Sequence, residues 1–159
     1  MLTVPIRRLS HASDLPLPSQ ATPASAGVDL LAAISDPQEL QPFARAIIPT
    51  GIALALPEGY EAQVRPRSGL AARHGITVLN SPGTIDADYR GEVAVIMVNL
   101  GEHRFVVERG MRIAQLIVAP VTLIRWEEQQ SLSTSARNDG GFGSTGTHVD
   151  DLTGGGEER

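Results

Sequence analysis

Residues 44–65 read ARAIIPTGIALALPEGYEAQVR and hold the pattern that decides the fold class. The apolar run 44–56 is interrupted by Pro49-Thr50-Gly51, and Pro57-Glu58-Gly59 separates it from residues 60–65. In residues 60–65 polar and apolar side chains alternate, which is the period of a β-strand with one buried face. Proline and glycine mark turns between such strands. The stretch therefore predicts short strands joined by turns, with one turn at residues 49–51.

The same pattern extends over most of the chain. Seven further short apolar runs are expected to form strands: 2–9, 28–34, 76–79, 92–100, 104–107, 112–118 and 121–126. The helical period is confined to residues 69–74, where Ser68 is expected to cap the N-terminus and Gly75 to end the helix. Many short strands separated by turn signals predict an all-β sandwich, barrel or jelly roll with one short helix.

Composition excludes several classes of protein. The 159 residues fit one domain, and the absence of cysteine excludes disulfides, thiolate nucleophiles and cysteine-based zinc sites. A net charge of −5 argues against a general nucleic-acid binder. No apolar run approaches the about 18 residues of a membrane span, and residues 1–8 do not resemble a signal peptide. We therefore expect a cytoplasmic protein without a nucleic-acid or membrane partner.

The composition changes after Trp126. Residues 127–159 are polar and rich in serine, threonine and glycine. Such a segment buries too little apolar surface to offset its ordering entropy. We expect a β domain over residues 1–126 and a flexible C-terminal arm over residues 127–159, with a glycine-rich motif at residues 137–146.

Two segments of the expected β domain suit phosphate. Arg67 and Ser68 stand where a strand gives way to the short helix, and helix N-termini bind anions through their N–H groups, although an ordinary capped turn with a solvated arginine fits this segment equally well. Asp29 lies within an apolar strand, where it either assists Mg²⁺ through a water molecule or accepts backbone hydrogen bonds. Gln115 interrupts another apolar run and needs a polar partner, either a phosphate oxygen or a neighbouring backbone group.

Residues 83–91, Gly-Thr-Ile-Asp-Ala-Asp-Tyr-Arg-Gly, combine carboxylates and an aromatic residue in a turn-rich segment. We expect a β-hairpin whose second strand is 92–100. Its mouth would present a carboxylate, an aromatic ring and backbone groups able to imitate a base-pair edge. Asp86 and Asp88 are equally common as turn formers. In the arm, Arg137 offers a fork for phosphate and Phe142 an aromatic face, although a glycine-rich run is also common in plain tails.

Taken together and in order, the segments 26–30, 66–70, 83–91, 110–116 and 137–146 resemble the five motifs of the homotrimeric dUTPase family. The resemblance implies a jelly-roll-like fold and a homotrimer with sites at subunit boundaries, each closed by a neighbour's arm. It also implies Mg²⁺-assisted hydrolysis of dUTP to dUMP and pyrophosphate, which lowers dUTP and supplies dUMP for dTMP synthesis.

The resemblance further implies a role for each matching residue. Asp86 activates the water that attacks the α-phosphate, and Tyr89 packs under the deoxyribose. Asp29 orients a magnesium-bound water. The remaining residues bind substrate: uracil by Asn80, Thr84, Ile85, Ala94 (across the expected hairpin) and Phe142, and phosphates by Arg67, Ser68, Gly69, Gln115, Arg137, Gly143, Ser144 and Thr145.

Two other functions compete with this one. The related dCTP deaminase fold, including bifunctional deaminase–pyrophosphatases, would release ammonia from dCTP. A non-catalytic nucleotide-binding trimer would bind dUTP without turnover. The Asp86 and Tyr89 segment and the complete arm motif favour the dUTPase over the deaminase. The presence of Asp86 alongside the phosphate motifs argues against the binding-only trimer.

Overall fold

The computed structural model describes residues 2–142 and 144. The chain divides into two compact units, Met1–Leu123 and Ile124–Arg159. The first unit contains every helix and strand of the described residues. In chain order they are β1 Ile6–Arg8, the 3₁₀ turn η1 Ser10–Ala12, β2 Val28–Leu31, β3 Gln38–Leu40, β4 Arg45–Leu54, β5 Tyr60–Arg65, α1 Ser68–His74, β6 Ile76–Val78, β7 Gly83–Ile85, β8 Glu92–Asn99, β9 Phe105–Val107 and β10 Arg112–Pro120.

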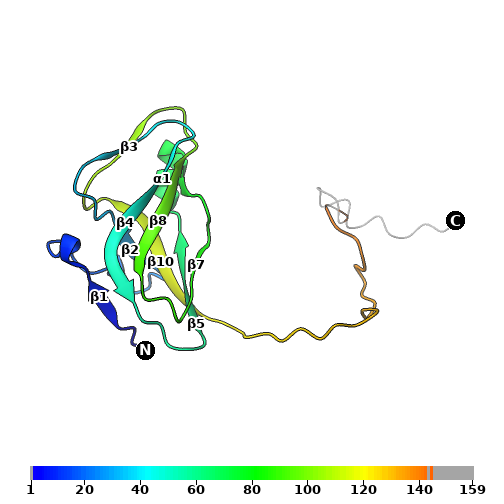
Figure 1. The fold of residues 1–159 in the computed structure, drawn as a ribbon. Helices are drawn as coiled ribbons and strands as arrows, with labels where there is room; N and C mark the ends of the chain where they lie inside the picture. Colours follow the sequence, from blue (N-terminus) through cyan, green and yellow to red (C-terminus); the bar gives the residue numbers. More distant parts are fainter. Residues whose placement is uncertain (1, 143, 145–159) are drawn as a thin grey trace. The chain divides into compact units, whose positions relative to one another are not determined.

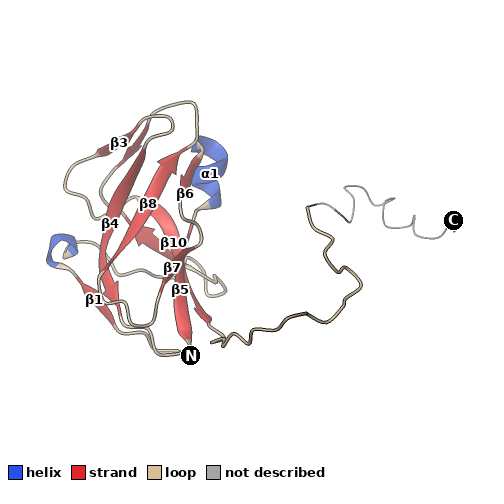
Figure 2. Cartoon of the chain, turned by 45° about the vertical axis from the view of Figure 1, so that its right-hand side comes forward, coloured by secondary structure: helices blue, strands red, loops and turns tan. Residues whose placement is uncertain are grey.

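The strands form two four-stranded sheets and one two-stranded ribbon. The first sheet has the order β1-β4-β8-β6 and the second β2-β10-β5-β7, while β3 pairs with β9. Figure 1 shows β4 and β8 side by side, and Figure 2 shows α1 at the end of the domain beside β6. The expected all-β, jelly-roll-like fold class is therefore confirmed, with the single short helix in its expected place.

One core lies between the two sheets. Val93, Val95 and Met97 enter it from β8, and Val64 and Leu116 enter it from the second sheet. Each of these five side chains is at most 5% exposed. Because side chains of a strand alternate between its faces, the residues between these core positions point outward. The outward faces of the sheets are thus where a site can form.

Arg109 ties the N-terminal segment to the domain. Its guanidinium donates to both carboxylate oxygens of Asp14, at 3.2 Å from Nε to Oδ2, and to the carbonyl groups of His11 and Ile34. The hydrogen bonds from Arg109 hold the pKa of Asp14 below its usual range. This network becomes weaker in acid, because it requires an ionised Asp14.

Two local expectations were wrong. Residues 49–51 do not end a strand: β4 continues through them with a bulge, since Pro49 lies opposite Ala94 but Ala53 already lies opposite Glu92. Gly51 takes a left-handed conformation, with φ +70°, inside this bulge. Ser68 does not cap α1 but begins it. Arg67 holds the capping position with an extended backbone and without a side-chain capping bond, while Gly75 ends the helix as expected.

The expected hairpin of residues 83–100 was also wrong. β7 pairs with β5 in the second sheet, whereas β8 pairs with β4 and β6 in the first. Gly83 and Ile85 of β7 are buried, so this strand is held by the core beneath the second sheet. Residues 86–91 cross from one sheet to the other. Ala94 therefore lies opposite Pro49 and not across a ladder from Thr84.

Two strand assignments differ as well. Residues 121–126 form no strand, and Leu123 and Trp126 are each 87% exposed, so they lack the packing that a strand requires. Conversely, β3 was missed because Leu40 is its single apolar residue. Among the described residues, no helix is long and apolar enough to cross a membrane.

Candidate functional site

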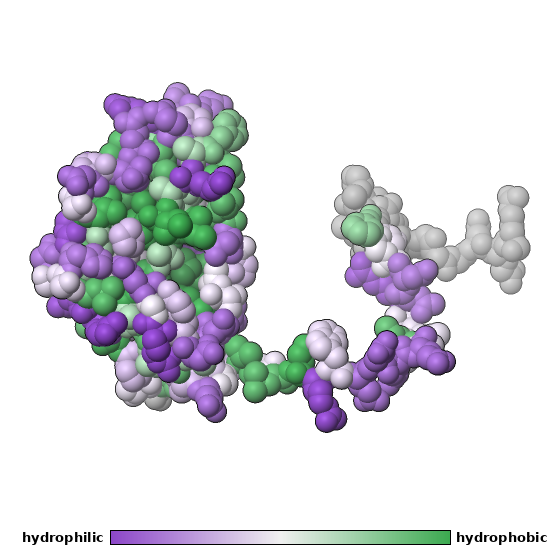
Figure 3. All heavy atoms as spheres, viewed as in Figure 1, coloured by the Kyte–Doolittle hydropathy of each residue, from purple (hydrophilic) through white to green (hydrophobic). Residues whose placement is uncertain are grey.

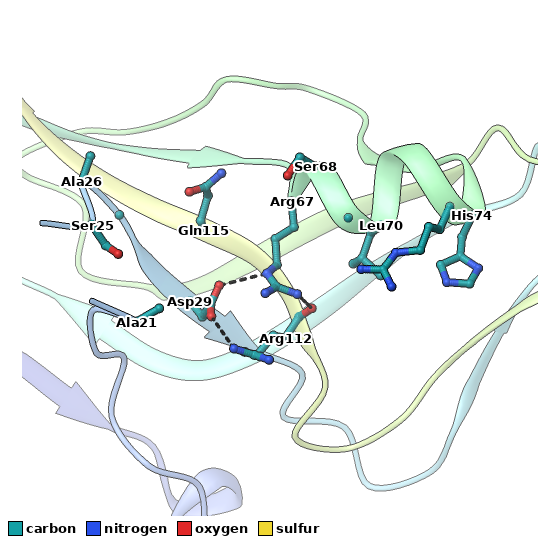
Figure 4. Close-up of a pocket in the computed structure, with 13 residues that line it drawn as sticks. Ala21, Ser25, Ala26, Asp29, Arg67, Ser68, Leu70, His74, Arg112 and Gln115 are labelled. Atoms are coloured by element: carbon teal, nitrogen blue, oxygen red, sulfur yellow. Dashed lines mark hydrogen bonds and ion pairs between the residues drawn. The ribbon is translucent and has the colours of Figure 1, made fainter. Parts of the chain in front are cut away.

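A hollow of about 560 Å³ opens on the second sheet beside the first turn of α1 (Figure 4). It brings together five residues that the sequence singled out, from segments far apart in the chain. We call it the basic pocket and define it by its lining residues: Ala21, Ser25, Ala26, Gly27, Asp29, Arg67, Ser68, Gly69, Leu70, Arg73, His74, Arg112 and Gln115.

Strand register places the polar groups of the basic pocket. Gln115 of β10 lies opposite Asp29 of β2 on one side and opposite Arg65 of β5 on the other. The neighbours of Gln115 along β10, Ala114 and Leu116, are buried. Gln115 and Asp29 therefore face outward by alternation. The chain leaves β5 at Arg65 and enters α1 at Ser68, after two connecting residues, which brings Arg67 to the same rim.

Asp29 is held between two arginines. Arg67 Nε donates to Asp29 Oδ1 at 2.9 Å and Arg112 Nη1 to Asp29 Oδ2 at 3.3 Å, as Figure 4 shows. Arg67 also donates to the carbonyl oxygen of Arg112 at 3.3 Å. Together with Arg73, the pocket carries three guanidinium groups against one carboxylate. The surplus positive charge suits a polyanionic ligand.

Sequence reasoning missed Arg112 and Arg73. Arg112 precedes Gln115 by three residues, so a regular strand would place the two side chains on opposite faces. However, β10 bulges at Ile113: Arg112 lies opposite Leu31 and Ala114 already opposite Leu30. The extra residue returns Arg112 to the outer face. Arg73 was accessible to sequence reasoning, because it follows Gly69 by one helical turn and its Nη2 lies 3.1 Å from where a Gly69 Cβ would stand.

Gln115 has a backbone partner. Its Nε2 donates to the carbonyl oxygen of Pro66 at 2.9 Å, which was the simpler of the two expected outcomes. A Cβ on Gly27 would lie 3.1 Å from Gln115 Oε1, so the glycine leaves room for the amide. The hydrogen bond joins β10 to the start of α1 and fixes the floor of the basic pocket.

The remaining residues expected in the β domain lie elsewhere. Within one chain, none of Asn80, Thr84, Ile85, Asp86, Tyr89 and Ala94 lines the basic pocket. β7 and β2 are at opposite edges of their sheet, three strand spacings or about 14 Å apart. Ile85 lies opposite Ala62, so Asp86 lies level with the residue before Ala62 on β5. That level is four residues, or about 13 Å, along β5 from Arg65, which lies opposite Gln115. In one chain the candidate site residues of the β domain therefore fall into two separate groups.

The segment around Asp86 is exposed and well ordered by hydrogen bonds. Asp86 is exposed, and its carbonyl oxygen accepts a hydrogen bond from Tyr89 N at 3.1 Å. Tyr89 is 45% exposed. Thr84 points outward from β7, whereas the side chain of Ile85 is buried, so only the backbone of Ile85 is placed to meet a ligand. Asn80 is exposed in the turn before β7, with its amide packed over Gly83.

The arm is described by itself. Arg137 Nε donates to Gly140 O at 2.9 Å, and Ser144 N donates to Gly141 O at 3.0 Å. Phe142 is fully exposed, with a positive φ of 44°. Gly143 and Thr145 lie outside the described residues.

The carboxylates limit how a metal ion can bind. Over residues 2–142 and 144 there is no group of three metal-ligating side chains. Asp29 is a single carboxylate, and each of its oxygens already accepts one arginine N–H. Each oxygen keeps a second lone pair for a water molecule. Mg²⁺ prefers phosphate oxygens and retained waters, so Asp29 fits an outer-sphere role and not a protein-built metal cage.

Comparison with known proteins gives one consistent family. A dUTPase family model matches residues 13–146. The deoxyuridine 5'-triphosphate nucleotidohydrolase of Aquifex aeolicus is 63% identical over 142 residues, covering 89% of this chain and 95% of that protein.

Solved structures agree. A Staphylococcus bacteriophage 80alpha dUTPase with dUPNHPP has a TM-score of 0.83 and 25% identity, covering 92% of this chain and 100% of that one. A mutant dUTPase from phage phi11 of S. aureus, which is described as coordinating a structural Mg(II) ion, has a TM-score of 0.74 and 21% identity, covering 84% of this chain and 100% of that one.

Proposed function

The chain belongs to the dUTPase family and hydrolyses dUTP to dUMP, and from this premise we propose how its residues divide the work. The basic pocket of one subunit holds the triphosphate. The segment 83–91 of a second subunit supplies the uracil and sugar contacts together with Asp86. The observation that carries this proposal is the basic pocket itself, in which Arg67 and Arg112 pair with Asp29 and Arg73 adds a third guanidinium group.

The basic pocket has the groups that a triphosphate requires. Arg67 and Arg112 present N–H donors in a planar arrangement that matches phosphate oxygens. Ser68 and Gly69 lie in the first turn of α1, where an α-helix leaves N–H groups without intrahelical partners. Gln115 stands between this first turn of α1 and Asp29. Each guanidinium group has five N–H donors, so a bound triphosphate can accept hydrogen bonds from those that Asp29 does not occupy.

Asp86 activates the attacking water in this proposal. Its carboxylate is exposed to solvent and can accept a hydrogen bond from a water molecule lined up with the α-phosphorus. Hydrolysis of a phosphoanhydride depends mainly on in-line positioning and charge neutralisation. The turn bond from Tyr89 N to Asp86 O fixes the backbone that carries this carboxylate.

The recognition of uracil rests on an edge strand. β7 is the last strand in the order of its sheet among the described residues, so one side of its backbone faces away from β5. Backbone N–H and C=O groups on such an edge can pair with the polar edge of a base. Thr84 and Ile85 contribute this backbone, Asn80 flanks it, and Tyr89 packs under the deoxyribose. Ala94 lies on β8, in the other sheet, and not across a ladder from these residues, so it contributes to the uracil site only as part of that neighbouring sheet.

Mg²⁺ enters with the triphosphate in this proposal and reaches the protein through a water molecule held by Asp29. When bound, the ion neutralises phosphate charge. The phi11 relative with a structural Mg(II) ion supports a role for magnesium in this fold, and the single carboxylate of the basic pocket suits an indirect contact.

A homotrimer completes the site. The basic pocket and the segment 83–91 of one chain lie far apart for one nucleotide, which supports a site that a second copy completes. Figure 3 shows apolar side chains gathered over β4 and β8, where Ile47 is 69% exposed, and this outer face is suited to self-association. The arm of a neighbour then closes the site with Arg137, Phe142, Gly143, Ser144 and Thr145. We also expect a cytoplasmic location.

Steady-state assays test this proposal. Asp86→Asn is expected to lower kcat for dUTP by about 100-fold or more, because a general base contributes 10²–10⁴-fold, while KM changes little. Asp88→Asn is the matched control, since Asp88 is exposed in the same turn and has no assigned role. Unchanged kcat in Asp86→Asn would refute its role. Ammonia release from dCTP would favour the deaminase, and dUTP binding without pyrophosphate release would favour a binding protein.

A further inference from the structure

Tyr89 is held in place through the residue that begins β8. Its hydroxyl group donates to the carbonyl oxygen of Glu92 at 2.9 Å. The ring folds back over Gly91, where a Cβ would collide with the hydroxyl group. Tyr89 N donates to Asp86 O at the other end of the same turn. The direction of the ring is therefore set by where the backbone of Glu92 lies.

The side chain of Glu92 is anchored to a different element. Glu92 Oε1 accepts a hydrogen bond from Gly51 N at 2.7 Å. The same oxygen lies 3.0 Å from His11 Nε2. The Glu92 side chain is 28% exposed, so these contacts are only partly open to competing water. Both partners belong to segments that lie more than forty residues before Glu92 in the chain.

The anchor at Gly51 is rigid. Gly51 lies in the bulge of β4 with φ +70°, a conformation that favours glycine. A Cβ at this position would overlap the methyl group of Ala12, and Ala12 and Ala33 beside it are 1% and 3% exposed. Leu9 N also donates to Gly51 O at 2.8 Å. The amide that holds Glu92 is thus fixed by the bulge and by close packing of the N-terminal 3₁₀ turn.

We propose that Glu92 is a positioning residue for discrimination between deoxyribose and ribose, acting through Tyr89. The connection runs from the Gly51 amide to the Glu92 carboxylate, and from the Glu92 carbonyl group to the Tyr89 hydroxyl group. Glu92 does not touch the nucleotide. The inference rests on the proposed role of Tyr89 under the sugar, because a ring that moves there admits a 2′-hydroxyl group.

The test compares kcat/KM for dUTP with kcat/KM for UTP. Glu92→Ala is expected to lower the dUTP-to-UTP ratio about three- to tenfold, the usual effect of one lost intramolecular hydrogen bond. Glu92→Gln keeps an oxygen that accepts from Gly51 N and should retain the wild-type ratio. Glu39→Ala serves as control, because Glu39 is also ion-paired, to Arg104, but lies on β3. Melting curves ensure that all variants are assayed while folded.

A double-mutant cycle separates positioning from general damage. Tyr89→Phe removes the hydroxyl group and should lower the ratio as much as Glu92→Ala, and the two changes together should add little to either one. Additive effects of the two changes would overturn the inference about Glu92 and leave the proposed sugar contact of Tyr89 standing. The same holds if Tyr89→Phe lowers the ratio and Glu92→Ala does not. An unchanged ratio in Tyr89→Phe would also overturn the inference about Glu92. An unchanged ratio in Tyr89→Ala would instead overturn the proposed sugar contact itself.

Discussion

Replacing Arg112 by alanine should weaken triphosphate binding more than it weakens binding of the product. A hydrogen bond to a charged group contributes about 1.5–3 kcal/mol. Arg112 is 58% exposed and shares its charge with Asp29 at 3.3 Å. Solvent screening therefore reduces the expected loss to about 1 kcal/mol, or about fivefold in KM for dUTP. kcat should change less, because Arg112 lies in the basic pocket, which we propose to hold the phosphates, away from Asp86.

The assay is steady-state pyrophosphate release, with inhibition by dUMP measured in parallel. dUMP lacks the distal phosphates, so its inhibition constant should stay within about twofold of wild type if Arg112 binds those phosphates. Arg104→Ala is the matched control, an exposed arginine that is ion-paired to Glu39. Added salt should shrink the difference between Arg112→Ala and wild type. An unchanged KM for dUTP would show that Arg112 only holds Asp29, and equal losses for dUTP and dUMP would contradict a contact with the distal phosphates.

Two further predictions concern the arm and the N-terminal network. A chain that ends at Ser135 should keep its melting temperature and lose most turnover. When this chain is mixed with an Asp86→Asn chain, about a quarter of the sites should become active if Asp86 and the arm come from different subunits of a randomly mixed trimer. Activity that stays at background in verified mixed trimers would contradict a site shared between subunits. Asp14→Asn should lower the melting temperature at pH 7, because the pKa of Asp14 is depressed by Arg109. That stabilisation is present above the unfolded pKa of about 3.9 and is lost as pH falls through the lower folded pKa. The melting temperatures of the wild type and the variant should therefore converge in acid. A constant difference between them down to pH 2 would contradict this assignment.

Local sequence patterns predicted the elements that local forces determine. The alternation in residues 60–65 gave the bounds of β5, and Gly75 ended α1 as expected. The pairing of strands was harder, because a turn after β7 does not say which sheet receives the next strand. β7 joins the second sheet because Gly83 and Ile85 are buried against it, and this packing depends on residues remote in the chain.

The grouping of five candidate residues in one pocket agrees with what their residue types suggested, while their role in phosphate binding stays a prediction. Arg67, Ser68 and Gly69 precede or begin a short helix, and the structure places them in one pocket with Asp29 and Gln115. What the residue types could not show is that Asp29 is already paired with two arginines. That arrangement depends on strand register and on the irregularity at Ile113, neither of which has a signature in a single sequence.

The extra residue in β10 makes the basic pocket depend on the backbone path of that strand as well as on the identity of its residues. Ile113 and Ala114 are both buried, at 2% and 0% exposure, so two successive side chains enter the core where a regular strand would send one. If the same residues paired as a regular ladder, Arg112 would turn toward the apolar interior, where its charge would lack a partner. A change that straightened β10 would therefore remove a positive charge from the rim of the basic pocket without replacing the arginine.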